Sequence, residues 1–308
     1  MRMLRVVALS VATGFLVVVA AMGAPPAPAP APAAQASPAG HAGWSAADCA
    51  ACHEPTISGM HGTAHAGVAG QCASCHGDPT AHLKSVTETG EPGPTPSFKK
   101  KAPREQDSTC LGCHDKGRQA NWHGGMHERR QVTCASCHSI HSFKSVQGQL
   151  KTSREADTCT SCHTQIRSRL MRVSHHPVRE GLMTCTSCHD PHDGTKPRMV
   201  SSNWVNEKCL ECHTEKRGPF LWEHAPVREN CMHCHDPHGS NHEKLLVSKQ
   251  PFLCQRCHLN TRHPGTLYDA TNSLAGPNPS NRAVEHACRN CHQNIHGSNA
   301  PSGPYLGR

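Results

Sequence analysis

The sequence predicts a chain that is mostly irregular, with short α-helices, and three observations predict this class. Ten copies of the motif Cys-x-x-Cys-His recur along the chain and use all 20 cysteines. Glycine and proline are frequent, at 25 and 24 residues, whereas aromatic residues make up 4% of the chain. Such a composition cannot supply an ordinary hydrophobic core. No apolar–polar alternation is long enough to predict a strand, so we expect short helices around each motif.

The repeated motif indicates covalent attachment of c-type haem, with the histidine as proximal iron ligand. Zinc sites also use Cys-x-x-Cys pairs, and disulfides would use cysteines, but neither explains a histidine at the same offset in ten motifs. We therefore predict ten c-type haems. The predicted haem-attaching residues are Cys49, Cys52, Cys72, Cys75, Cys110, Cys113, Cys134, Cys137, Cys159, Cys162, Cys185, Cys188, Cys209, Cys212, Cys231, Cys234, Cys254, Cys257, Cys288 and Cys291. The predicted proximal ligands are His53, His76, His114, His138, His163, His189, His213, His235, His258 and His292.

The motifs pair into five two-haem modules, which indicates an internal repeat. Two modules share the segment Cys-His-Asp-Pro-His, at 188–192 and 234–238. Stacking of such units from neighbour to neighbour predicts an elongated multihaem cytochrome c in which the haems form the core in a quasi-linear chain. Two longer connectors, at 77–109 and 264–287, are rich in turn-forming residues and are predicted to be loops. The modules open at Cys49, Cys110, Cys159, Cys209 and Cys254.

The histidine count predicts bis-histidine iron at every haem. The chain has 27 histidines, so enough remain after the proximal set to supply ten distal ligands. A histidine three residues past a proximal ligand is badly placed to reach the opposite face of the same porphyrin, so we expect it to bind another haem. The predicted distal ligands are His65, His82, His127, His141, His175, His192, His224, His238, His263 and His296. Three alternatives stay open, namely His61 for His65, His123 for His127 and His176 for His175.

Full six-coordination leaves no open iron position, so the ligand set predicts an electron carrier rather than an enzyme. We predict no catalytic residue. An enzyme, such as a nitrite- or metal-reducing cytochrome, would need an open position on at least one haem.

The N-terminus predicts export. Residues 1–23 combine two arginines, an apolar stretch and the cleavage site Ala-Met-Gly, which is typical of a signal peptide. A membrane anchor and later cleavage at 34–36 are the alternatives. Residues 24–44 are a Pro/Ala-rich linker. Since c-type haem is attached outside the cytoplasm, we expect a periplasmic protein. Haem propionates outweigh the formal charge of +8, so no nucleic acid partner is expected.

Over residues 45–308 the chain resembles the MtrA/DmsE (PioA-like) family of periplasmic decahaem c-type cytochromes. The resemblance depends on the ten dispersed motifs, both Cys-His-Asp-Pro-His segments and the closing segment at 295–303. It implies two pentahaem halves, 45–180 and 181–308. It also implies a cytochrome inside an outer-membrane β-barrel of MtrB type, a porin, that conducts electrons between periplasm and cell exterior.

The implied partners are that barrel, periplasmic donor or acceptor cytochromes, and an extracellular multihaem cytochrome or reductase. The alternative is a soluble periplasmic electron shuttle to a terminal reductase, which shares every haem feature. The direction of electron flow is open.

Overall fold

The computed structural model describes residues 45–68, 71–94, 98–145, 147–258, 288–301 and 303–307. The predicted signal peptide, 1–23, and the predicted linker, 24–44, lie outside these residues. The chain divides into two units, Met1–Gly40 and His41–Arg308, and the second unit holds all ten motifs. The division of that unit into two pentahaem halves near residue 180 stays a prediction.

The regular structure of the described residues consists of short helices joined by turns, with isolated β-bridges and no strand. This confirms the predicted class. The α-helices are α1 (Ala46–Ser58), α2 (Cys72–His76), α3 (Thr80–Thr89), α4 (Pro103–Leu111), α5 (Met126–Arg129), α6 (Cys134–Cys137), α7 (Glu155–Thr160), α8 (Thr164–Leu170), α9 (Val205–Leu210), α10 (Ala225–Glu229) and α11 (Phe252–Gln255). The 3₁₀ helices are η1 (Ala66–Val68), η2 (Phe98–Lys100), η3 (Gly117–Asn121), η4 (Gln147–Gln149), η5 (Cys185–Ser187), η6 (Pro197–Met199), η7 (Thr214–Lys216), η8 (Cys231–His233), η9 (Glu243–Leu245) and η10 (Cys288–Asn290).

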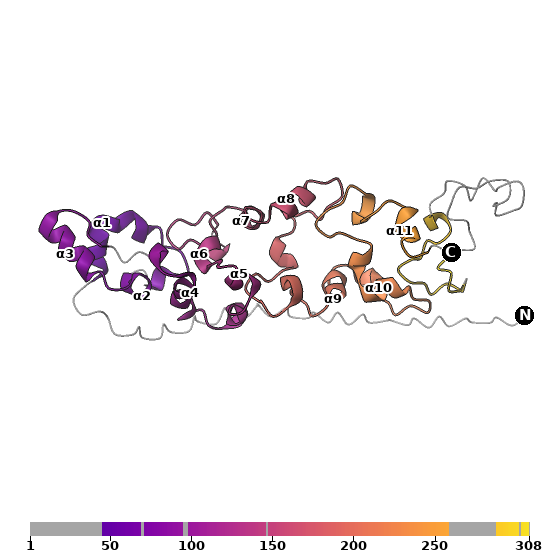
Figure 1. The fold of residues 1–308 in the computed structure, drawn as a ribbon, viewed down its shortest axis with the longest axis horizontal. Helices are drawn as coiled ribbons and strands as arrows, with labels where there is room; N and C mark the ends of the chain where they lie inside the picture. The colour runs from indigo at the N-terminus through magenta and orange to yellow at the C-terminus, as the bar shows by residue number, and fades with distance from the viewer. Residues whose placement is uncertain are drawn as a thin grey trace, which may run out of the picture. The chain divides into compact units, whose positions relative to one another are not determined.

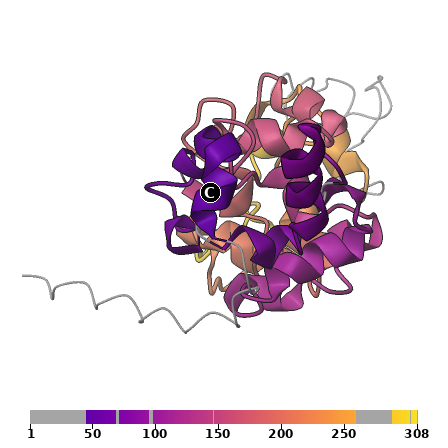
Figure 2. The same cartoon turned by 90° about the vertical axis from the view of Figure 1, so that its left-hand side faces the viewer.

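Within the unit His41–Arg308, α1, α2 and α3 lie at one end, α9, α10 and α11 lie toward the other, and α4 to α8 lie between them (Figure 1). Figure 2 views the unit from the end that α1, α2 and α3 occupy. Helices that pack together are near neighbours in the chain, such as α2 with α4 and α4 with α6. Neighbour-to-neighbour packing is the arrangement that the repeated modules predict.

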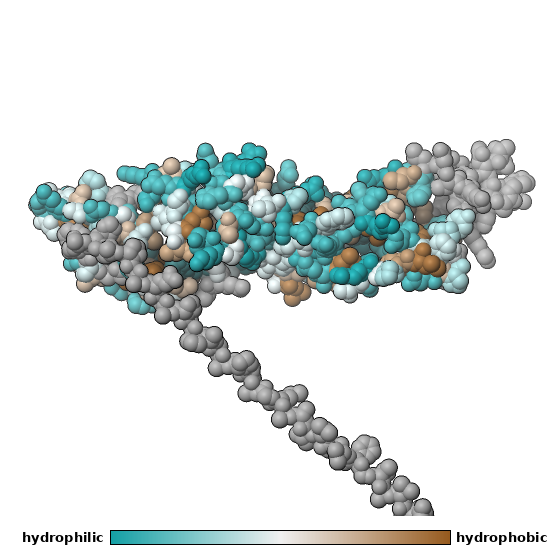
Figure 3. Space-filling model, turned by 90° about the horizontal axis from the view of Figure 1, so that it is seen from below, coloured by the Kyte–Doolittle hydropathy of each residue, from teal (hydrophilic) through white to brown (hydrophobic). Residues whose placement is uncertain are grey.

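The polypeptide itself contributes a small apolar core. Among the described residues, the buried apolar side chains are Met60, Trp122, Leu170 and Leu306. Hydrophilic residues cover most of the described part of the face in Figure 3, and apolar residues form small separate groups on it. So little apolar burial cannot stabilise a unit of this length without attached groups. No described helix combines the length and the hydropathy that crossing a membrane requires.

The connector at 77–109 is not the loop that the sequence predicts, because it contains α3 and the start of α4. Helix α3 ends at Thr89, and the φ of 72° at its C-cap, Gly90, is the left-handed conformation that glycine favours. The Pro- and Gly-rich stretch that dominates the composition follows this helix, so composition averaged over the connector hides it. The second predicted loop, 264–287, lies outside the described residues.

Candidate functional site

Each Cys-x-x-Cys-His motif forms one helical turn. In the last eight motifs, the histidine N–H donates to the carbonyl of the first cysteine, at 2.9–3.1 Å. The first two motifs lie in α1 and α2. Positions i, i+3 and i+4 share one face of a helix, so this turn presents both thiols and the imidazole to the same side. That is the arrangement that a porphyrin attached through two thioethers requires.

Nine of the ten proximal histidines face a second histidine. The ring centroids of each pair lie 5.9–6.4 Å apart. The tenth proximal histidine is His292, and the predicted distal residue His263 lies outside the described residues. The pairs are His53–His82, His76–His141, His114–His65, His138–His192, His163–His127, His189–His238, His213–His176, His235–His296 and His258–His224.

These separations fit an iron between the two imidazoles. Two metal–nitrogen bonds of about 2.0 Å and roughly 1.1 Å from each ring centre to its coordinating nitrogen place the centroids about 6.2 Å apart. Unbonded imidazoles in van der Waals contact would stack more closely. The residues present therefore fit a haem iron with one axial imidazole on each side.

The pairs follow a reciprocal pattern between modules. The histidine that trails the second motif of a module faces the second motif of the preceding module, as His238 faces His189. The histidine upstream of the second motif faces the first motif of the following module, as His127 faces His163. The first module has no predecessor, and its trailing His82 faces its own His53. Each interior module therefore contributes one histidine backward and one forward.

Backbone carbonyls orient many of these imidazoles through Nδ1. Among proximal residues, Nδ1 of His189 is hydrogen-bonded to the Arg198 carbonyl at 3.0 Å, and His138, His235 and His292 make equivalent bonds. A hydrogen bond at Nδ1 fixes the tautomer and leaves Nε2 to bind metal. The remaining acceptors are Pro191 O for His127, Pro237 O for His176, Ile295 O for His224 and the side-chain oxygen of Gln149 for His65.

Of the two neighbouring histidines that the sequence leaves open at this position, His176 rather than the preferred His175 faces His213. His175 turns to Glu180, 3.1 Å from its Nε2, and to the Arg172 carbonyl, 2.6 Å from its Nδ1. The sequence alignment on the shared Pro-Val-Arg-Glu segment is one residue out of register here. For the other two open choices, His65 and His127 face motif histidines.

Burial lowers the pKa of the five distal imidazoles for which the shift is clear. For His296 the pKa falls to about 4, because burial is joined by the nearby cation of Lys216 and by His235. Neutral imidazole is the form that binds iron, so burial keeps these rings in the binding form. The others with a lowered pKa are His141, His192, His224 and His238.

Contacts between thiols place the motifs next to one another in chain order. Within each module the thiols of the two first cysteines are neighbours, and this contact raises the pKa of Cys134, Cys159 and Cys209. Between modules the second cysteines are neighbours, so burial and then Cys212 raise the pKa of Cys188. The neighbouring pairs are Cys49–Cys72, Cys110–Cys134, Cys159–Cys185, Cys209–Cys231 and Cys254–Cys288.

A polar side chain ahead of the first motif anchors the second motif in the middle modules. The Asp107 carboxylate, 1% exposed, accepts from Cys134 N–H and Trp122 Nε1–H, both at 2.8 Å. Glu155 accepts equivalent bonds from the N–H and hydroxyl of Thr186. The sequence does not single out these residues, although their common place before a first cysteine is a signal that alignment of the modules could reveal.

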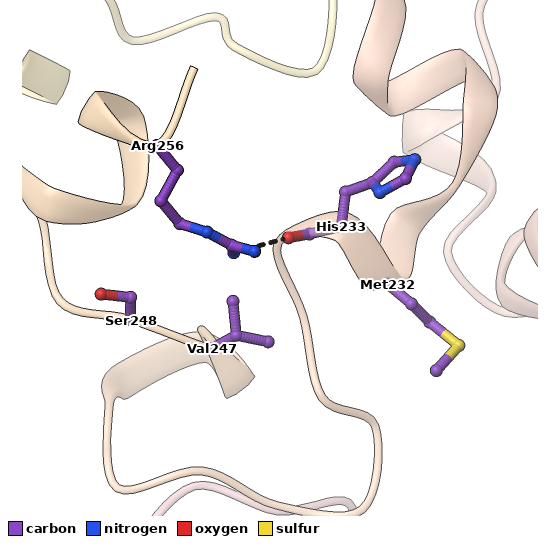
Figure 4. Close-up of a pocket in the computed structure, with 5 residues that line it drawn as sticks. All are labelled: Met232, His233, Val247, Ser248 and Arg256. Carbon is purple, nitrogen blue, oxygen red and sulfur yellow. Dashed lines mark hydrogen bonds between the residues drawn. The ribbon is translucent and has the colours of Figure 1, made fainter. Parts of the chain in front are cut away.

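Glu155 also lies beside Cys159 and Cys185, with ligand atoms within 4.8 Å of one another. This cluster is not a separate metal site, because both cysteines belong to haem motifs and the carboxylate is bonded to Thr186. At the end of the fourth module, Arg256 donates to the His233 carbonyl at 3.2 Å, and the His233 ring points away (Figure 4). That bond links the fourth module to the fifth.

Backbone bridges hold neighbouring modules together beside the histidine pairs. Ser174 and Ser240 exchange two hydrogen bonds, of 3.0 and 2.7 Å, and Trp222 and Ser298 exchange two of 2.9 Å. Each bridge joins the residue two before an upstream histidine to the residue two after a trailing one. At Gly239, with φ of 147°, a Cβ would lie 2.1 Å from the Arg169 carbonyl oxygen. The close approach therefore requires glycine.

Comparisons with known proteins agree with these sites. A family model described as a doubled CXXCH motif matches residues 175–218 and 224–263, and one described as cytochrome c-type protein NrfB-like matches 72–154. The chain is 37% identical over 275 residues to multiheme cytochrome MtrA of Shewanella baltica, which covers 84% of this chain and 80% of that protein. It is 33% identical over 135 residues to cytochrome c-type protein NrfB of Escherichia coli O6:H1, covering 40% and 67% of the two chains.

Proposed function

Because the chain belongs to the MtrA family of multihaem c-type cytochromes, which transfer electrons, we propose that it conducts electrons between periplasm and cell exterior as part of an outer-membrane porin–cytochrome complex. The observation that carries this proposal is the set of nine facing histidine pairs in motifs that lie next to one another in chain order. Such a set fits a continuous series of redox centres.

The proposed cofactor set is ten c-type haems with bis-histidine iron. The cysteines of each motif hold the porphyrin, the motif histidine binds one face of the iron, and the facing histidine binds the other. His176 takes the distal position opposite His213, and His263 is the proposed partner of His292. When bound, each haem supplies a one-electron iron couple whose potential depends on its ligands and surroundings.

With both axial positions held by imidazole, the chain offers no iron position to a substrate, so we propose that it is not an enzyme. Where a carbonyl accepts from Nδ1–H, the bond fixes the tautomer and leaves Nε2 aimed at the iron. A ligand set that does not change between oxidation states favours electron transfer with little rearrangement. The reciprocal histidines then fix each module against the next.

The proposed location is the periplasmic face and interior of an outer-membrane β-barrel of MtrB type. A series of many haems suits a path across a membrane of about 40–45 Å. The described part of the face in Figure 3 is largely hydrophilic, and hydrophilic side chains are costly in contact with lipid. The interior of a large barrel is polar, so such a partner would separate the cytochrome from lipid. Periplasmic and extracellular cytochromes would supply and remove electrons.

Isolation of the native complex from outer membranes tests this function. We expect the cytochrome to copurify with one barrel protein, and its mass to account for ten haems. Proteoliposomes that contain both proteins should oxidise or reduce an enclosed redox dye from outside, whereas the barrel alone should not. Recovery of the cytochrome free of any barrel protein, from cells that express both, would instead favour the soluble periplasmic shuttle.

A further inference from the structure

The first cofactor site differs from the others in how its imidazoles are held. His53 faces His82 with the ring centroids 6.4 Å apart. Nδ1 of His82 is buried and has no hydrogen-bond partner, and none of the described residues forms a hydrogen bond with the His53 ring. Seven of the other eight described pairs have at least one imidazole with a hydrogen bond at Nδ1, and in the eighth the His141 ring interacts with the backbone of Thr56. Even the pair of His192, whose own Nδ1 is unpartnered, contains His138, which is bonded to the Gly148 carbonyl.

The helix that carries His82, α3, has no buried side chain, which is also true of α5, the helix that carries His127. The Ser85 hydroxyl of α3 donates to the Glu91 carbonyl, so part of the contact of this helix is with the chain that follows it. His82 belongs to the same module as His53, whereas His176 and His224 lie beside bridges to a neighbouring module. Among the residues that the structure describes, no β-bridge to another module lies beside the distal histidine of the first site.

Both differences weaken the same bond. A hydrogen bond from Nδ1–H raises the basicity of an axial imidazole and fixes its ring, and loss of such an outer contact typically reduces metal affinity 10–100-fold. A helix without buried side chains opens at low cost. We propose that His82 is the most easily displaced axial ligand of this chain, and that the first site therefore binds small exogenous iron ligands of the cyanide class.

This inference depends on the bis-histidine ligation proposed above. In the substitution, Nε2 of His82 leaves the iron as neutral imidazole and the carbon of one cyanide anion takes its place. No electron is gained or lost. The other axial ligand, His53, stays bound.

The test is a cyanide titration of the oxidised, full-length holoprotein, followed by EPR and visible absorption. Before cyanide is added, we expect every haem to be low-spin. A high-spin signal at this stage would contradict the proposed bis-histidine ligation. It would not bear on whether His82 is displaced more easily than the other distal histidines. On titration we expect one haem equivalent to react with an affinity at least about tenfold higher than the rest. A uniform response, or none, overturns the inference.

Two matched variants assign the reactive haem. His82→Ala opens the first site, so the variant should still show one tight equivalent, because the opened haem is the one that already reacts. His192→Ala opens the site of His138 and should show two. Two tight equivalents in His82→Ala would mean that the reactive haem lies elsewhere. Should His82→Ala fail to accumulate, His82→Met supplies a weaker ligand at the same position and carries the same expectation.

Discussion

His176 faces His213 with 6.4 Å between their ring centroids, while the adjacent His175 turns away to Glu180. The choice between two neighbouring histidines follows from the bridge beside them. Ser174 pairs with Ser240 as Trp222 pairs with Ser298, and the distal residue comes two positions after each bridge residue. This register selects His176 and His224.

Substitution of His176 and, separately, of His175 tests that register. We expect His176→Ala to leave one haem without its distal ligand and to give a high-spin ferric EPR signal. The matched variant His175→Ala should keep every haem low-spin, because it removes a contact to Glu180 rather than an iron ligand. A high-spin signal from His175→Ala alone would restore the original sequence-based choice.

Removal of the Asp107 carboxylate should destabilise the second module. In Asp107→Ala the buried N–H groups of Cys134 and Trp122 lose their acceptor, at a cost of roughly 3 kcal/mol in the free energy of unfolding. Denaturant unfolding of the holoprotein measures this loss. Asp107→Asn keeps one acceptor oxygen and should lose less. Equal stability of both variants and the native protein would show that these bonds contribute nothing.

A methyl group at Gly239 should separate the third and fourth modules. The Cβ of Gly239→Ala would meet the Arg169 carbonyl at 2.1 Å in a backbone conformation with positive φ, and we expect a loss of roughly 3 kcal/mol in stability. Gly181→Ala is the control, since its φ is 78° and nothing lies within 4 Å of its Cβ; strain alone should cost about 1 kcal/mol there. Thermal unfolding of both variants provides the comparison.

Synthesis without haem attachment should yield an unfolded chain. With so few apolar side chains buried, the polypeptide lacks the burial needed to offset its conformational entropy. Far-UV circular dichroism and limited proteolysis of the haem-free chain measure this. Protease-resistant fragments of the same size as those from the holoprotein would contradict the expectation.

The sequence predicts the cofactor motifs and the helix-poor class because both depend on local spacing. Nine of the ten predicted distal residues lie among the described residues, and eight of them face a motif histidine. For the motif that each of them faces, the sequence predicts only in general terms that a trailing histidine binds another haem. The partner depends on packing between modules, and no spacing within one module encodes it.

Two differences between the sequence-based expectations and the structure have the same physical origin. The repeated Pro-Val-Arg-Glu segment favours His175, but α10 begins directly after His224, whereas the residues after His176 form a turn. The same four residues, Pro-Val-Arg-Glu, therefore have different backbone conformations in the two modules. The connector that contains α3 was assigned as a loop because its Gly and Pro residues were averaged over a stretch that holds both a helix and a turn-rich segment.

The exchange of histidines between modules also bears on how such chains change length. Suppose that an interior module were deleted. The upstream histidine of the module before the gap would then face the first motif of the module after it. The trailing histidine of the module after the gap would face the second motif of the module before it. Every iron would keep two imidazoles. Gene duplication or deletion can thus lengthen or shorten the series by two centres at a time, whereas gain or loss of a single motif would leave ligands unmatched.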